Sequence, residues 1–291
     1  MSKHKNSSKP RKPRNKARNF KAAGASGKAG KKSGPKRPPA KSAQDGDIPY
    51  WIFGIHASLA AISNPQRACE RIILADTANP DLESEVAIAQ KRVPGRPDVE
   101  RLKRKEVEGL LPPGSIHQGL AVLAPPLENS SIEDIIDHCQ GSTIVSVVVL
   151  DQATDPRNIG AVMRSAAAFG ALAVIVQDRH APHITGTLCK AASGAVERVP
   201  LVRAVNLSRA IGTLKTAGFW AAGLDPGAKQ TLAEADLSGL VALVLGAEGK
   251  GLRRLTRDTC DQLLKVPISQ AAGSLNLSNA AAIALYEMSR K

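Results

Sequence analysis

The sequence of 291 residues contains few aromatic side chains and no long apolar run. Aromatic residues make up 3% of the chain, which argues against an RNA reader that stacks bases on several exposed rings. No apolar stretch approaches the roughly 18 residues of a membrane-spanning helix. The first residues also lack the apolar core of a secretory signal. These absences lead us to expect a soluble, cytoplasmic protein without a membrane partner.

Cysteines are few and widely spaced, and none forms a C-x-x-C pair. This spacing argues against a zinc module and offers no disulfide framework. His180 and His183 lie near Cys189 in the sequence, but their spacing matches no common ligand pattern, so we expect solvated loop positions for both histidines. We therefore expect no metal site, and reduced thiols at all four cysteines: Cys69, Cys139, Cys189 and Cys260.

Acidic residues are absent from the first 44 positions, which carry 15 Lys or Arg. The remainder of the chain has 25 basic and 26 acidic residues, so the overall charge of +14 comes from a basic extension on a nearly neutral body. We expect residues 1–47 to be disordered, because this composition repels itself and has little to bury. The extension either binds phosphates through counterion release or merely keeps the protein soluble; we favour phosphate binding.

Alternating apolar strands and helices fill the rest of the sequence. Residues 48–124 predict a small α/β domain that starts with a helix at 52–62. Residues 125–141 predict a linker and a leading helix, and 142–291 predict a larger α/β domain. The larger domain has short strands rich in Val and Leu, which indicates a parallel sheet covered on both faces. We expect these strands at 145–150, 173–177, 199–202, 219–223, 240–245 and 263–266.

Ligands of such sheets bind beyond the carboxyl ends of the strands, so we expect functional residues in the loops there. After residue 150, a helical pattern places Asn158 and Arg164 off its apolar stripe. The two lie about 9 Å apart along a helix axis. Both are able to serve one pocket, since arginine is long and helical side chains lean toward the N-terminus. The alternative is that Asn158 caps the helix and Arg164 is solvated.

Two further loops contain small and polar residues. Residues 246–251 hold three glycines around Glu248, a pattern that permits tight turns or close backbone approach to a ligand. They match neither a P-loop nor a dinucleotide fingerprint, which disfavours an ATPase or a dehydrogenase. Ser274 and Asn276 stand at the entrance of the last helix, where free backbone N–H groups are available to a ligand.

These segments contain three motifs in order: Asp155-Pro156-x-Asn158-x-Gly160 with Arg164, then Gly246-Ala247-Glu248-Gly249-x-Gly251, then Ser274-Leu275-Asn276-x-Ser278. Together they resemble the three motifs of the SpoU, or TrmH-like, family of RNA ribose 2′-O-methyltransferases. Residues 50–124, with Gly54-Ile55-His56 and His117-Gln118-Gly119, also resemble the RNA-binding domain of the branch that methylates a guanosine of large-subunit ribosomal RNA.

The resemblance implies a SPOUT-type α/β fold, with a parallel sheet, a C-terminal trefoil knot and an active site completed across a homodimer. It implies S-adenosylmethionine as the cofactor. Its contacts are expected at Gly246, Val266 and Leu275, with Leu245, Ile268 and Leu277 nearby.

The resemblance also implies catalytic or substrate-positioning roles for five residues: Asn158, Arg164, Glu248, Ser274 and Asn276. The expected reaction is 2′-O-methylation of a ribose, on a guanosine of 23S ribosomal RNA. Two alternatives stay open: a transfer RNA methyltransferase, and a non-catalytic RNA-binding protein of ribosome assembly with the same fold.

Overall fold

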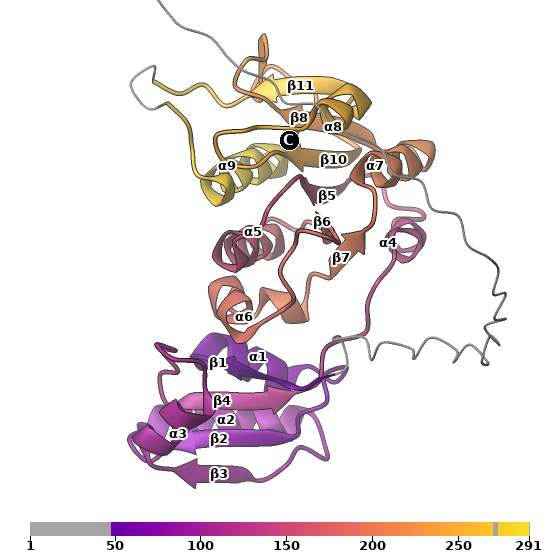
Figure 1. The fold of residues 1–291 in the computed structure, drawn as a ribbon. Coiled ribbons are helices and arrows are strands. Elements are labelled where there is room, and N and C mark those ends of the chain that lie inside the picture. The colour runs from indigo at the N-terminus through magenta and orange to yellow at the C-terminus, as the bar shows by residue number, and fades with distance from the viewer. Residues whose placement is uncertain (1–47, 270–272, 291) are drawn as a thin grey trace, which may run out of the picture. The chain divides into compact units, whose positions relative to one another are not determined.

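The computed structural model of the chain describes residues 48–269 and 273–290 (Figure 1). From Ile48 onward these residues belong to one compact unit that contains two β-sheets. The extension at 1–47, expected to be disordered, lies outside the described residues. Within the described residues, no helix is long and apolar enough to cross a membrane.

The smaller sheet is mixed, with strand order β1-β4-β2-β3. β4 runs antiparallel to both β1 and β2, and β2 runs parallel to β3. Helix α2 begins after Asn79, whose side chain accepts a hydrogen bond from the Leu82 N–H. The helix also has a proline in its first turn. The elements are β1 Tyr50–Phe53, α1 Ile55–Ser63, β2 Arg71–Ala75, α2 Pro80–Arg92, β3 Val99–Leu102, α3 Arg104–Leu110 and β4 Leu120–Ala124.

The helix predicted at 52–62 is wrong at its start. Tyr50–Phe53 form strand β1, and helix α1 begins only at Ile55. The strand consists of aromatic and β-branched residues, which suit a pleated surface. Gly54 separates the two elements with a φ of 93°, a backbone conformation that glycine adopts without a steric penalty.

The larger sheet has seven strands in the order β7-β6-β5-β10-β8-β11-β9, and every pair is parallel. This confirms the predicted parallel sheet. Its strands are β5 Val145–Leu150, β6 Ala173–Gln177, β7 Leu201–Ala204, β8 Trp220–Leu224, β9 Gln230–Thr231, β10 Leu240–Leu245 and β11 Gln262–Lys265. The accompanying helices are α4 Ile132–His138, α5 Pro156–Ala168, α6 Gly186–Ala192, the 3-10 helix η1 Ala195–Glu197, α7 Leu207–Thr216, α8 Arg254–Thr259 and α9 Leu277–Ser289.

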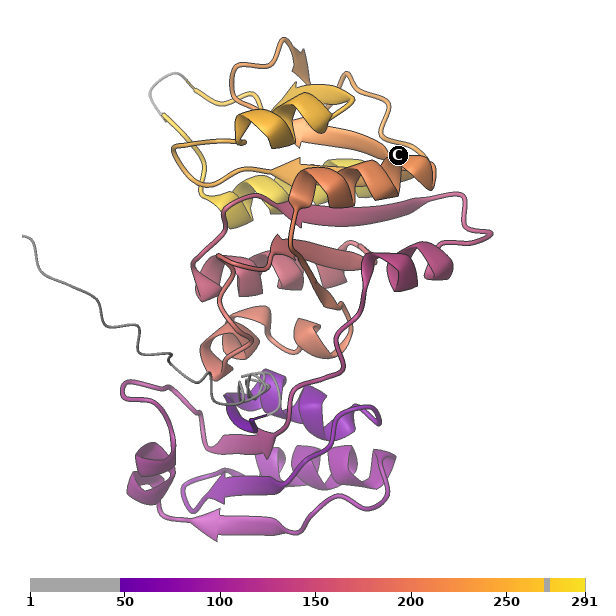
Figure 2. The same cartoon turned by 45° about the vertical axis from the view of Figure 1, so that its right-hand side comes forward.

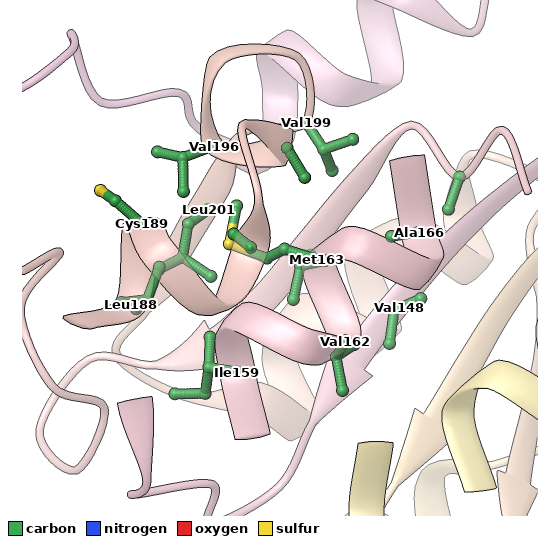
Figure 3. Close-up of a cluster of buried hydrophobic side chains, with 14 of the residues drawn as sticks. Val148, Ile159, Val162, Met163, Ala166, Leu188, Cys189, Val196, Val199 and Leu201 are labelled. Atoms are coloured by element: carbon green, nitrogen blue, oxygen red, sulfur yellow. The ribbon is translucent and has the colours of Figure 1, made fainter. Parts of the chain in front are cut away.

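Helices cover both faces of this sheet, as the continuous apolar strands predict (Figures 1 and 2). In β5, Val148 faces the core shared with α5 and α9, whereas Val147 faces the core shared with α4 and α7. Figure 3 shows Val148 beside Val162 of α5. The strands thus fix α5 against the sheet, and the loop that precedes α5 opens at the carboxyl edge.

Gly160 permits a close approach of α5 and α6. A Cβ atom at this position would lie 2.6 Å from the Leu188 carbonyl oxygen and 2.7 Å from the Ala191 Cβ. Both distances are far below van der Waals contact, so only glycine fits here. This glycine, part of the first motif, therefore has a packing role that is separate from any chemistry.

A buried ion pair joins the two sheet-forming regions. Arg67, in the connection after α1, binds Glu197 of η1 through its Nη2 at 2.7 Å, and its side chain has no exposed surface. The same guanidinium donates to the Pro125 carbonyl oxygen, while Asn64 donates to Glu197. Because both charges are paired and hydrogen-bonded, their burial is tolerated. The pair fixes the α1 region against the segment that carries η1.

Candidate functional site

Two side-chain amides and one carboxylate meet in a cluster that we call the polar network: Asn158 from the first turn of α5, Glu248 from the loop after β10, and Asn276 at the N-cap of α9. Asn158 Nδ2 donates to Glu248 Oε1 at 2.8 Å, and Asn276 Nδ2 donates to the same oxygen at 2.7 Å. The Leu277 backbone N–H is a third donor to that oxygen, at 3.1 Å. Asn276 Nδ2 also reaches Asn158 Oδ1 at 3.1 Å. The structure thus brings together three of the five predicted catalytic residues.

The local fold explains these positions. Asp155, not Asn158, caps α5, because its side chain accepts from the Arg157 N–H. Asn158 therefore has its side chain free for the polar network, and the alternative reading of it as a cap is wrong. Asn276 does cap α9, since its Oδ1 accepts from the N–H groups of Ser278 and Asn279. Its Nδ2 is directed to Glu248, so one side chain serves both the helix and the site.

The loop that carries Glu248 is held at both ends. At its start, a Cβ atom on Gly246 would lie 2.0 Å from the Gly251 carbonyl carbon, so the turn requires glycine. At its end, Arg253 binds the fully buried Asp151, which follows β5, through Nη2 at 2.7 Å and through its backbone N–H at 2.9 Å. Sequence reasoning did not select Asp151; an acid directly after a buried strand is the signal that could have found it.

A cavity of about 510 Å³ opens beside the polar network, a size suited to a small ligand. His180 lines it together with Asn158 and Glu248; this histidine is exposed in a turn, as the sequence predicts, but its place at the cavity was not expected. Lys250 adds a cation from the glycine-rich loop. Ala247 and Leu277 also line the cavity. The other lining residues come from the segment after β5: Gln152, Ala153, Thr154 and Asp155.

The predicted cofactor contacts differ in accessibility. The side chains of Leu245 and Leu277 belong to the core, so these residues offer only backbone groups. Ile268 is 38% exposed, and Val266 and Leu275 are half-buried. Among the six predicted residues, only Leu277 is in the wall of the cavity beside the polar network. Gly246, the sixth, turns the chain out of β10.

Arg164 lies in a different place from the polar network. It lines a second cavity of about 430 Å³, which we call the arginine groove. The expectation that Asn158 and Arg164 serve one pocket is therefore not met within the described part of the chain. Ser274 is exposed.

The arginine groove contains three exposed guanidinium groups and no acidic residue. Arg92 comes from the end of α2, Arg164 from α5 and Arg198 from the residue after η1. None of the three has an ion-pair partner within the described residues. The other lining residues are His56, Leu59, Ala60, Ser63 and Ser193. Unpaired cations with hydroxyl groups beside them form a surface suited to phosphate.

Comparison with known proteins identifies relatives of this chain. A model of the SpoU rRNA Methylase family matches residues 146–286. The 23S rRNA (guanosine-2′-O-)-methyltransferase RlmB of Photobacterium profundum is 36% identical over 241 residues, which cover 82% of this chain and 97% of that protein. An uncharacterized tRNA/rRNA methyltransferase of Synechocystis is 37% identical over 257 residues, 87% of this chain but only 66% of that longer protein.

A solved structure shares the fold. The SpoU methyltransferase AviRb of Streptomyces viridochromogenes, in complex with AdoMet, superposes with a TM-score of 0.67 over 83% of this chain and 89% of that one, at 20% identity. Sequence and fold therefore agree, and the chain belongs to the SpoU rRNA methylase family, with the α/β architecture and parallel sheet expected of it.

Proposed function

We propose that the protein is an S-adenosylmethionine-dependent methyltransferase that methylates a ribose 2′-hydroxyl in 23S ribosomal RNA, on a guanosine. The observation that carries this proposal is the polar network, in which Asn158, Glu248 and Asn276 come from three separate segments of the chain and share hydrogen bonds at one edge of the sheet. The relatives named as 23S rRNA (guanosine-2′-O-)-methyltransferases support the substrate.

The residues around this edge fit S-adenosylmethionine. Ile268 is exposed and Leu275 is half-buried, so both leave apolar surface that an adenine ring would cover. Gly246, half-buried directly after β10, would offer backbone groups. Leu245 and Leu277 would contribute backbone groups, and Val266 a half-buried contact. When bound, this cofactor supplies an electrophilic methyl group.

The chain's own contribution is positioning and charge stabilisation. Holding two reactants in line is worth up to about 7–11 kcal/mol of the barrier. Glu248 orients the amides of Asn158 and Asn276, and Ser274 offers a hydroxyl from the same loop as Asn276. Arg164 binds the ribose or a neighbouring phosphate and stabilises developing negative charge. We assign it no role as a base, because an arginine with a pKa above about 12 does not release its proton.

The separation of Arg164 from the polar network supports a site shared between two subunits. We propose a homodimer in which the partner completes the constellation. Ile283 and Tyr286 of α9 are 41% and 52% exposed and present an apolar surface that a second subunit would cover. The C-terminal trefoil knot is part of the same proposal, and a cytoplasmic location follows from a ribosomal RNA substrate.

The basic extension at 1–47 is proposed as an arm that attracts RNA without reading its sequence. Deleting residues 1–44 removes 15 cations and should flatten the dependence of RNA affinity on salt concentration. The measurement is the slope of log affinity against log salt for the full chain and the shortened chain. Equal slopes would refute the arm.

The experiment for the main proposal uses labelled S-adenosylmethionine and total RNA from a strain that lacks the gene. Mapping should find one new 2′-O-methyl group, on a guanosine of 23S ribosomal RNA. Label in transfer RNA would instead favour the activity named for the Synechocystis relative. RNA binding without any label transfer would support a non-catalytic assembly protein.

A further inference from the structure

A third cavity, of about 350 Å³, lies in the smaller sheet region. Helix α3 supplies Arg104 and Glu108 to its lining, and the loop before β4 supplies most of the rest. Lys190 of α6 donates a hydrogen bond to the Ile116 carbonyl oxygen, which holds this loop in place. The loop residues in the wall are Ser115, Ile116, His117, Gln118 and Gly119, and Thr77 completes the lining.

His117 is buried in this wall with one nitrogen unsatisfied. Its residue surface is 4% exposed, and its Nδ1 accepts a hydrogen bond from the Gly119 N–H at 3.1 Å. The ring proton is therefore on Nε2, and Nε2 has no partner within the described residues. Burial lowers the pKa of His117, which keeps the ring neutral. A buried donor without a partner is costly and calls for an acceptor from outside the chain.

Helix α3 presents both a cation and a carboxylate to the same cavity. Arg104 Nε binds Glu108 Oε1 at 3.0 Å, which leaves the Arg104 terminal nitrogens and Glu108 Oε2 for other contacts. Their side chains are 68% and 47% exposed, so a ligand reaches them from solvent. The two charges offset each other, which disfavours a phosphate here and distinguishes this cavity from the arginine groove.

The combination of donors and one acceptor matches guanine among the bases. Guanine offers acceptors at O6 and N7, which arginine binds bidentately, and donors on its Watson–Crick edge. Arg104 and His117 supply the donors, and Glu108 supplies the acceptor that the exocyclic amino group needs. Ile116, 68% exposed at the rim, provides an apolar surface for the face of the ring.

We propose that this cavity binds an unpaired guanine base of the RNA substrate. The proposal rests on the proposed function, because it names a second point of recognition for the same RNA, separate from the methylated nucleotide. The cavity lies in the region that precedes the methyltransferase motifs, so the base that it holds sets the register of the RNA on the protein.

The test measures binding of the full chain to single-stranded oligoadenosine RNAs with one central guanosine, inosine or adenosine, by fluorescence anisotropy and without S-adenosylmethionine. The guanosine RNA should bind about tenfold more tightly than the adenosine RNA. Inosine, which lacks the amino group, should fall between them. Glu108→Gln should remove most of the preference, while Glu83→Gln, in the exposed Glu83–Arg101 ion pair of the same sheet region, should retain it.

A second measurement locates the base and does not depend on folding of a variant. An RNA with 6-thioguanosine at the central position should crosslink to the peptide that contains residues 115–119. His117→Asn keeps an acceptor for the Gly119 N–H, lacks the Nε2 donor, and should weaken guanosine binding alone. Equal binding of guanosine and adenosine RNAs, or crosslinks elsewhere, would overturn the proposal. Selective binding without methyl transfer to ribosomal RNA would instead count against the proposed function and leave this cavity standing.

Discussion

The polar network and the arginine groove use polar side chains in opposite ways. In the polar network, Glu248 Oε1 accepts from three donors, so its charge is already engaged before any ligand arrives. In the arginine groove, Arg92, Arg164 and Arg198 have no ion-pair partner among the residues that the structure describes. The Glu248 carboxylate is hydrogen-bonded within the protein, whereas the guanidinium groups of the groove are available to an anionic ligand.

The two regions therefore place different demands on a ligand. A satisfied network keeps its geometry whether or not a ligand is bound, which is the requirement for positioning reacting atoms. Unpaired cations repel one another and gain stabilisation only when a polyanion arrives. The first region is built for orientation. The second captures RNA through Arg92 and Arg198 and supplies Arg164 to stabilise developing charge, so substitutions should separate these roles.

Replacing Arg164 with alanine should have the largest effect. We expect kcat/KM for methyl transfer to fall about a thousandfold, equivalent to about 4 kcal/mol, because a charge-stabilising donor is lost. Binding of S-adenosylmethionine, measured by calorimetry, should stay nearly unchanged. Arg209→Ala, an exposed arginine of α7 on the other face of the sheet, is the control. Unaltered turnover in Arg164→Ala would rule out its assigned role.

Replacing Arg67 with methionine should destabilise the contact that holds η1, and with it Arg198 of the groove, against the α1 region. The Glu197 charge would remain buried with only Asn64 as a side-chain partner, so the free energy of unfolding in urea should fall by about 3 kcal/mol. The double variant Arg67→Met/Glu197→Met should recover most of that loss, since two apolar residues leave no buried charge. A single variant as stable as the wild type would show that the pair does not hold the two regions together.

Replacing Glu248 with alanine should damage the polar network alone. Three donors would lose their acceptor, and we expect kcat/KM to fall about a hundredfold, or about 2.7 kcal/mol. Glu248→Gln keeps an oxygen acceptor and should retain much more activity. RNA affinity in a filter-binding assay should be unchanged in both variants; a loss of RNA affinity would contradict the division between the two regions.

Replacing Arg198 with alanine should have the smallest effect. RNA affinity should weaken a few-fold, and the slope of log affinity against log salt should fall by about 0.7–0.9, as expected for one lost phosphate contact. The rate at saturating RNA should stay at the wild-type value. A rate defect at saturation would place Arg198 in the chemistry rather than in capture.

Much of the larger sheet could be predicted, because its strands are buried on both faces and are therefore apolar at every position. The proximity of Asn158, Glu248 and Asn276 could be predicted for a related reason, since each follows a strand of one parallel sheet and meets the others at its carboxyl edge. Short elements escaped prediction: α8 has six residues with only Thr256 buried, and β9 has two residues.

The groove could not be predicted from the sequence. Arg92, Arg164 and Arg198 are brought together by packing of α1 and α2 near α5 and η1, and no local pattern encodes that packing. His180 was missed for the same reason, because its position beside Glu248 depends on how the loop after β6 folds back. The division into separate domains at 48–124 and 142–291 stays a prediction.

The glycine of the first motif bears on how relatives of this chain are recognised. Gly160 is required by the contact between α5 and α6, so a protein that has lost catalysis but kept the fold would still need it. Its presence in a homologue reports the architecture, whereas Asn158 and Arg164, which have no such packing constraint, report the chemistry. A search that weights the two flanking residues above the glycine should separate active enzymes from inactive descendants.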